Sequence, residues 1–227
     1  MRRALFLASV VVVALVGAAA PALAAPGQSF HFALSGRGAE GGWSTYPTDG
    51  SFVTNVVYRD TYIGTATQAW KSNGTMANGT SLSVDVFSYK FDRRGNFMPV
   101  SEVFGFIEGS SLAIDSKLQG ATASGSGAAD VCQIDVDWNY TCVPGTVSVS
   151  ASWTGQGPLM RSHGSSSFGV SGEFQSTFHG TFLSRAATAT ATVQVNGSSV
   201  DIGPNWGADM FSFSNGENDV FICRSGC

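Results

Sequence analysis

The chain has 227 residues and a formal net charge of −4, with 12 Lys and Arg against 16 Asp and Glu. Only 12% of its residues are charged, and 43% are hydrophobic, which excludes intrinsic disorder. Because the basic residues form no cluster, neither nucleic acid nor the surface of an anionic membrane is an expected partner.

The first 25 residues have the three parts of a secretory signal peptide. Arg2 and Arg3 precede an apolar run over residues 4–20, and the small residues around Ala22 and Ala24 suit cleavage. The apolar run is shorter than the roughly 20 residues that a transmembrane helix needs. We therefore expect residues 1–24 to be removed after Ala24, leaving an extracellular or cell-envelope protein with no membrane span.

From residue 29 onward, apolar residues recur at every second position between Gly, Asn and Ser, which is typical of half-buried antiparallel strands. The clearest segment is 187–195, where Ala and Val alternate with Thr and Gln before Asn196-Gly197, a pair typical of a type I′ turn. Its alanines predict close packing against the inner face. In 82–91 the apolar parity switches, which indicates either a bulge between residues 86 and 87 or a strand buried on both faces.

This pattern predicts one all-β domain over residues 25–227, an antiparallel β-sandwich or flattened barrel. The Gly- and Ser-rich stretch 119–129 is the candidate internal boundary, with a glycine-rich strand as the alternative. A faint echo between residues 35–40 and 124–129 raises the possibility of a duplicated β unit.

Four cysteines in an exported chain indicate two disulfides, and three pairings exist on paper. We favour Cys132 with Cys142, which flank an expected hairpin, and Cys223 with Cys227, which are close in sequence. A zinc site is not favoured, because no Cys-x-x-Cys pair is present and the compartment is oxidising.

The sharpest polar cluster lies between the first two cysteines. Asp135, Asp137 and Asn139 stand at alternate positions, as in the first part of a Ca²⁺ loop, but the Gly and Glu of an EF-hand are missing. Asp135 and Asp137 are also spaced as a pair of glycosidase carboxyls would be, although nothing on a solvated strand raises either pKa. We weigh Ca²⁺ as the one candidate cofactor, against a merely solvated polar strand face.

Other catalytic patterns are weak. The segment 161–167 contains Ser162 and His163, but no Gly-x-Ser-x-Gly elbow is present, and we interpret it as a polar loop between strands. The expectation leans against an enzyme, and no residue is assigned as catalytic.

Several aromatic residues stand beside Gly, Asn and Thr and not within the apolar alternation. Trp153, by contrast, belongs to the alternation, and we interpret it as a core residue. Flat rings beside amides and carboxylates suit stacking on sugars or docking of a protein. Each ring has a plain alternative, which is to close an end of the sandwich. The candidate ligand-binding residues are Trp43, Trp70, Trp138, Tyr140 and Trp206.

Taken together, the sequence predicts a secreted, non-catalytic binding module whose partner is a polysaccharide or an envelope protein. The alternatives are a small extracellular hydrolase of carbohydrate and a structural surface or coat protein. The oligomeric state has no sequence signal.

Overall fold

The computed structural model describes residues 29–72, 75–170 and 174–222, and this part of the chain is all β. It contains no helix, and therefore no helix of the length and apolarity that crossing a membrane requires. The signal peptide and the Cys223–Cys227 disulfide that the sequence predicts lie outside the described residues. The strands are β1 (Ser29–Ser44), β2 (Val57–Ser72), β3 (Thr75–Phe91), β4 (Phe97–Glu108), β5 (Ser111–Ile114), β6 (Gly120–Ile134), β7 (Tyr140–Gly155), β8 (Met160–Val170), β9 (Phe174–Val195), β10 (Ser198–Val200) and β11 (Asn205–Ile222).

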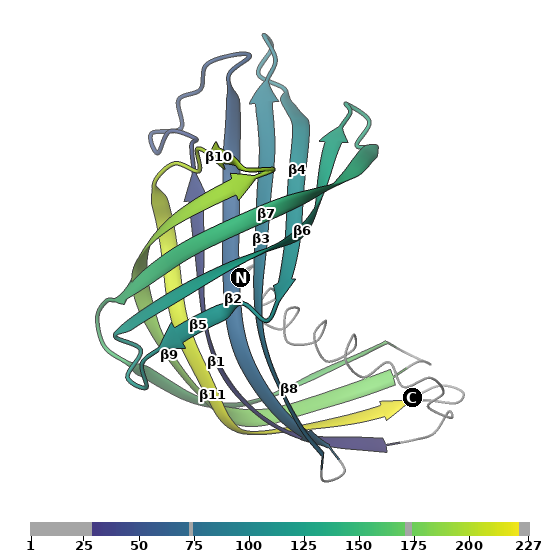
Figure 1. Cartoon of the computed structure of the whole chain (residues 1–227), viewed down its shortest axis with the longest axis vertical. Helices are drawn as coiled ribbons and strands as arrows, with labels where there is room; N and C mark the ends of the chain where they lie inside the picture. Colours follow the sequence, from purple (N-terminus) through teal and green to yellow (C-terminus); the bar gives the residue numbers. More distant parts are fainter. Residues whose placement is uncertain (1–28, 73–74, 171–173, 223–227) are drawn as a thin grey trace.

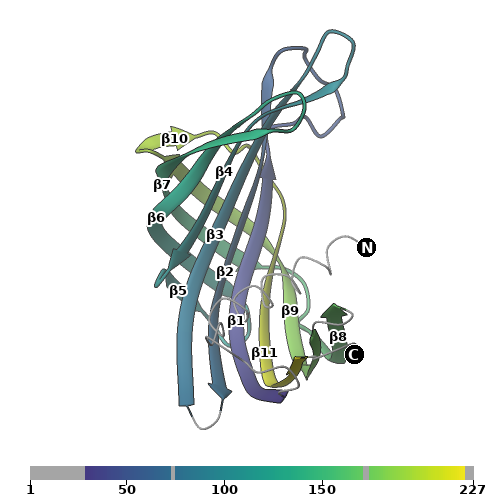
Figure 2. The ribbon, with the colours of Figure 1, turned by 90° about the vertical axis from the view of Figure 1, so that its right-hand side faces the viewer.

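The strands form one antiparallel sheet that closes on itself. Around the ring the order is β9, β11, β1, β2, β3, β4, β6 and β7, and β7 returns to pair with β9. The short β5 and β10 pair with β6 and β9, and β8 pairs with the first half of β9. In Figure 1, β6 and β7 cross in front of β1–β4 as a second layer, and in the turned view of Figure 2 they lie to the left of β1–β3. The predicted flattened barrel is thus confirmed.

Small residues let the two walls of the ring come close together. Ala187 and Ala189 are buried, as the alanine run predicts, and Val147 of β7 packs directly over Gly105 of β4. The interior is filled by large side chains as well, with Trp43, Trp153, Ile63, Leu82 and Met210 fully buried. The indole Nε1 of Trp153 donates a hydrogen bond across the ring to the backbone carbonyl of Glu40, at 2.9 Å.

Three segments differ from the simplest sequence interpretation. The stretch 119–129 lies largely within β6, in the middle of the sheet, so the glycine-rich strand is the correct alternative. The segment 161–167 is part of β8 and not a loop, and the His163 ring nitrogen Nδ1 lies 2.9 Å from the Thr181 hydroxyl of β9. In β3 the pairing with β2 runs unbroken from residue 75 to residue 90, so no bulge interrupts residues 86–87.

The parity switch in β3 has a different cause. Val84 and Val86 point into the ring, whereas Phe87 and Tyr89 point outward and meet other rings on the outer surface. The strand is therefore covered on both faces, at different heights. The irregularity lies in the partner strand, because Ser88 pairs with Ser101 and Tyr89 with Pro99, which leaves an extra residue in β4.

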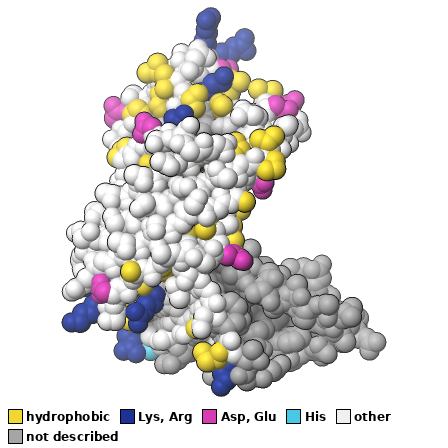
Figure 3. All heavy atoms as spheres, viewed as in Figure 1, with side chains coloured by type: hydrophobic (Ala, Val, Ile, Leu, Met, Phe, Trp, Pro, Cys, Tyr) yellow, Lys and Arg dark blue, Asp and Glu magenta, His cyan; other side chains and the backbone are white. Residues whose placement is uncertain are grey.

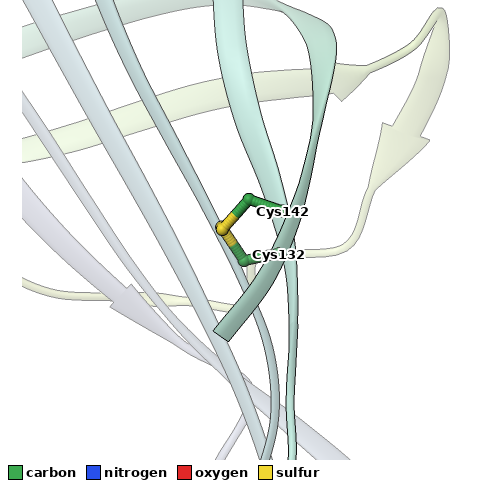
Figure 4. Close-up of a disulfide and its surroundings, with 2 residues drawn as sticks. All are labelled: Cys132 and Cys142. Carbon is green, nitrogen blue, oxygen red and sulfur yellow. A yellow bond between two sulfur atoms is a disulfide. The ribbon is translucent and has the colours of Figure 1, made fainter. Parts of the chain in front are cut away.

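The two local predictions near the hairpins are confirmed. Asn196 and Gly197 both have positive φ, 50° and 78°, and join β9 to β10. Cys132 and Cys142 stand opposite each other on β6 and β7 and form a disulfide (Figure 4).

The close approach of the walls can be tested at Gly105. A Cβ at this position would lie 2.5 Å from Val147 Cγ1, so we expect Gly105→Ala to lower the free energy of unfolding by about 1–3 kcal/mol in urea titrations. Adding Val147→Ala should recover part of that loss. Gly164→Ala is the control, because nothing lies within 4 Å of its added Cβ. Equal effects of the two glycine variants would contradict the packing.

Candidate ligand-binding face

Carboxylates and aromatic rings gather on one outer side of the ring. The register places Tyr62 opposite Asp85, Asp85 opposite Phe104, and Phe87 opposite Glu102, all on the outward positions of β2, β3 and β4. The same row continues to Asp130 of β6, and Glu40 pairs with Asp209 on the other side. We call this surface the acidic aromatic face. Its carboxylates are Glu40, Asp60, Asp85, Glu102, Glu108, Asp130 and Asp209, and its rings are Tyr62, Phe87, Phe97, Phe104, Phe106, Trp138 and Tyr140.

Three of these rings share one orientation. The planes of Phe87, Phe97 and Trp138 lie within 11° of one another, and their centroids are 6.1–6.3 Å apart in every pair. In a single column of three stacked rings, the centroids of the two outer rings would be twice as far apart as the centroids of two adjacent rings. The three rings therefore form a compact cluster of parallel rings and not a single column. Trp138 is 53% exposed and Phe97 44%, whereas Phe87 is half-buried, and we call these three rings the aromatic platform.

The turn between β6 and β7 holds Trp138 in this position. Asp135 Oδ1 accepts hydrogen bonds from the backbone N–H groups of Asp137 and Asn139, and its Oδ2 accepts one from Asn139 Nδ2. Trp138 takes the left-handed conformation, with φ of 63°. Large side chains rarely adopt this conformation, because Cβ then crowds the following carbonyl.

The turn between β3 and β4 has the same hydrogen bonds. Asp92 accepts from Arg94, from Asn96 N and from Asn96 Nδ2, and the left-handed position is occupied by Gly95, with φ of 80°. Trp138 of the β6–β7 turn thus occupies the position that Gly95 occupies in the β3–β4 turn, and glycine is the residue best suited to a positive φ.

This geometry gives the Asp135 cluster a structural role. Hydrogen bonds from Asn139 are the largest cause that holds the pKa of Asp135 below its ordinary value. A general acid needs the opposite shift, so the carboxyl pair with Asp137 is not supported as catalytic. Both oxygens of Asp135 already bind turn donors, and the described residues contain no group of three or more His, Cys, Asp or Glu arranged for a metal. The alternate spacing that suggested Ca²⁺ is explained by the turn.

The carboxyl with the opposite behaviour is Asp85, which the sequence analysis did not single out. Burial, and then the neighbouring charge of Glu102, raise the pKa of Asp85 from 3.8 to about 6. Its Oδ1 is buried without a hydrogen-bond partner. Glu102 also contributes, after partial burial, to a raised pKa of Tyr140. Asp85, Glu102 and Tyr140 thus form one electrostatic group beside the platform.

A second group lies on the adjacent strands β1 and β2. The Tyr62 hydroxyl donates a hydrogen bond to Glu40 Oε2. Burial raises the pKa of both groups, and the nearby Asp209 adds to both shifts. Glu40, Tyr62 and Gly64 line a shallow depression whose sides are Phe106 and Phe211. Desolvated carboxyls on an outer surface indicate that the surrounding rings shield them from water.

The other aromatic residues that the sequence predicts as ligand-binding differ in burial and location. Trp43 is only 2% exposed and belongs to the core, so it cannot present its ring to a ligand. The side chain of Trp70 lies outside the described part. Trp206 is 55% exposed and its ring lies over Gly42, at the β1–β11 side of the same outer surface. Tyr140 is exposed and, with Trp138, is the part of the predicted set that lies on the acidic aromatic face.

The opposite side of the ring has a different chemistry. Figure 3 shows a broad area without charge over β6 and β7. Ser and Thr occupy the outward positions there, and they line an open hollow of about 310 Å³. Several of their hydroxyls are already paired, as in Ser126 with Ser148 and Ser152 with Thr190, each at 2.8 Å. The described residues that line this hollow are Ser, Thr and Ala, so they offer hydrogen bonds but neither aromatic rings nor carboxylates.

No protein-family model matches this chain, and neither a curated protein nor a solved structure is significantly similar to it. The functional argument therefore depends on the geometry of the acidic aromatic face.

The strain at Trp138 gives a stability test. Trp138→Ala removes the ring and keeps the left-handed conformation, whereas Trp138→Gly removes the ring and relieves the strain. We expect the Gly variant to be the more stable by about 1 kcal/mol in urea titrations, the reverse of the usual order in strands. Gly95→Ala should be destabilising by a similar amount. An Ala variant more stable than the Gly variant would contradict this.

The raised pKa of Asp85 gives a pH test. The unfolded chain loses this proton near pH 3.8 but the folded protein keeps it to about pH 6. The free energy of unfolding therefore falls as the pH rises through this interval, by about 3 kcal/mol, and the penalty is complete above pH 6. We expect Asp85→Asn to remove this dependence and to be more stable than wild type at pH 7.5. Parallel pH profiles of the two proteins would contradict the shift.

Proposed function

We propose that this protein is an exported, non-catalytic binding module that holds a carbohydrate on its acidic aromatic face. The observation that carries the proposal is the platform of Phe87, Phe97 and Trp138, a cluster of parallel rings in which Phe97 and Trp138 are exposed, because exposed aromatic rings suit the C–H faces of sugar rings. Phe104 and Phe106, which are 49% and 44% exposed, extend the aromatic surface along β4. The neighbouring carboxylates supply acceptors for sugar hydroxyls.

A protein partner is the other occupant that the sequence allows, and the arrangement favours it less. Extended peptides usually add to a free sheet edge or enter a groove. The outer face of β2, β3 and β4 offers no edge, because each of these strands is paired on both sides. A surface of aromatic rings and hydrogen-bond acceptors therefore fits a sugar polymer better than it fits an extended peptide.

Binding can be measured with the mature protein and a panel of insoluble polysaccharides. We expect Trp138→Ala combined with Tyr140→Ala to weaken binding at least about tenfold, because exposed aromatic anchors carry most of an interface's free energy. Met160→Ala is the matched control, since Met160 is as exposed as Trp138 but lies on β8. Binding that survives the double variant, or that Met160→Ala lowers equally, would contradict the proposed surface.

The hydrolase alternative now has one observation in its favour, and it involves different residues from those that the sequence suggested. Asp85 keeps a proton to about pH 6 beside Glu102, as a general acid beside a second carboxyl would. Both side chains, however, stand on an outer sheet face beside exposed rings. Turnover of a chromogenic glycoside that Asp85→Asn abolishes, with the fold retained, would replace the binding function by this one.

A further inference from the structure

The charges on the acidic aromatic face are segregated by strand register. The strands β1, β2 and β3 contain four basic residues, Arg37, Arg59, Lys71 and Lys90. All four have the inward parity, because Arg37 shares a face with Ala39, and Arg59 and Lys71 with Ile63, while Lys90 shares one with Val86. The acidic residues Glu40, Asp60 and Asp85 have the outward parity.

The neighbouring strands strengthen this asymmetry. Within their bounds, β4, β6, β7 and β11 contain no Lys or Arg at all, and they add Glu102, Glu108, Asp130 and Asp209 to the outer side. The next basic residues after Lys90 are Arg93 and Arg94, which lie in the turn that follows β3. No lysine or arginine among the described residues forms an ion pair with Asp85 or Glu102. Asp85 and Glu102 are therefore two neighbouring carboxylates without a cation between them among the described residues.

Like charges in this arrangement repel one another, because the register places Asp85 opposite Phe104 and Glu102 opposite Phe87 on the same outer face of two paired strands. Glu102 contributes to the raised pKa of Asp85, and Asp209 to that of Glu40. A bound cation would relieve both effects, and it would also interact favourably with the faces of Phe104 and Tyr62. Charge complementarity thus selects a positively charged ligand.

Resting on the proposed function, we infer that the sugar polymer bound here is cationic, a polysaccharide of amino sugars with free amines. Its ring faces would lie on Phe87, Phe97 and Trp138, and its ammonium groups beside Asp85 and Glu102. A neutral polysaccharide would use the rings but leave the carboxylates unneutralised. A basic peptide would use the carboxylates but has no flat C–H faces to match the parallel rings.

Four soluble probes separate these cases: glucosamine hexamer, N-acetylglucosamine hexamer, cellohexaose and hexalysine. We expect the glucosamine hexamer to bind about tenfold more tightly than the two neutral hexamers in about 0.1 M salt, at a pH where its amines are protonated. That advantage should shrink severalfold in about 1 M salt, where charges are screened beyond about 3 Å. Isothermal titration calorimetry measures all four affinities.

Variants then assign the effect to the face. Asp85→Asn with Glu102→Gln should remove most of the preference for the amine, because it should weaken the glucosamine hexamer severalfold more than it weakens the neutral hexamers. Asp201→Asn is the matched control, because Asp201 is exposed and follows β10, on another part of the ring. Trp138→Ala should weaken all three sugars together.

The outcomes distinguish the two proposals. Equal binding of the three sugars would overturn the cationic ligand and support the carbohydrate-binding function. Binding of hexalysine alone would overturn both in favour of a basic peptide. Binding of none of the four would overturn both, and loss of the amine preference in Asp201→Asn would overturn the assignment to Asp85 and Glu102.

Discussion

The hydrogen bond from the Trp153 indole to the Glu40 carbonyl shows the constraint that shapes the molecule, which is the short distance between the two walls of the ring. Gly105 makes that distance possible on one wall, and Ala189 does so beside Trp153. The side chains of Trp43, Ile63 and Met210 occupy what space remains. Because the described interior is filled in this way, the binding surface that we propose lies on the outside of the ring.

The two outer sides of the ring carry different kinds of side chain, although both belong to one sheet that surrounds a common interior. Around the hollow on β6 and β7 the outward positions are Ser and Thr, and several of their hydroxyls hydrogen-bond to one another. On β2, β3 and β4 they are carboxyls and rings, and the unpartnered Asp85 Oδ1 opposes folding at neutral pH. Surfaces that bind are often less stable than they could be, because groups meant for a ligand lack partners in its absence.

The sequence predicted the features that depend on neighbours in the chain. Alternation showed the strands, Asn196-Gly197 showed a turn, and the spacing of Cys132 and Cys142 across a hairpin showed their pairing. The acidic aromatic face depends instead on register between strands. Asp85 and Glu102 are 17 residues apart, and neither has a local signal that would link it to the other.

The aromatic candidates illustrate the same limit. Trp43 and Trp138 both follow polar or small residues, yet the register buries one and the turn displays the other. In 82–91 the switch of parity was a real signal, but its cause was a second aromatic layer outside the ring. A search for apolar residues on the solvent side of a strand, such as Phe104 and Phe106, is the one sequence signal that would have located the face.

The pairing of β1 with β11 also fixes when the ring can form. These strands lie at opposite ends of the described chain, and β9, which pairs with β7, β8, β10 and β11, is complete only at Val195. A polypeptide that emerges N-terminus first must therefore wait, with β1 to β4 unclosed, until nearly all of it has been delivered. Closure that depends on such non-local pairing is slow, and one edge of β1 stays unpaired until β11 has been made.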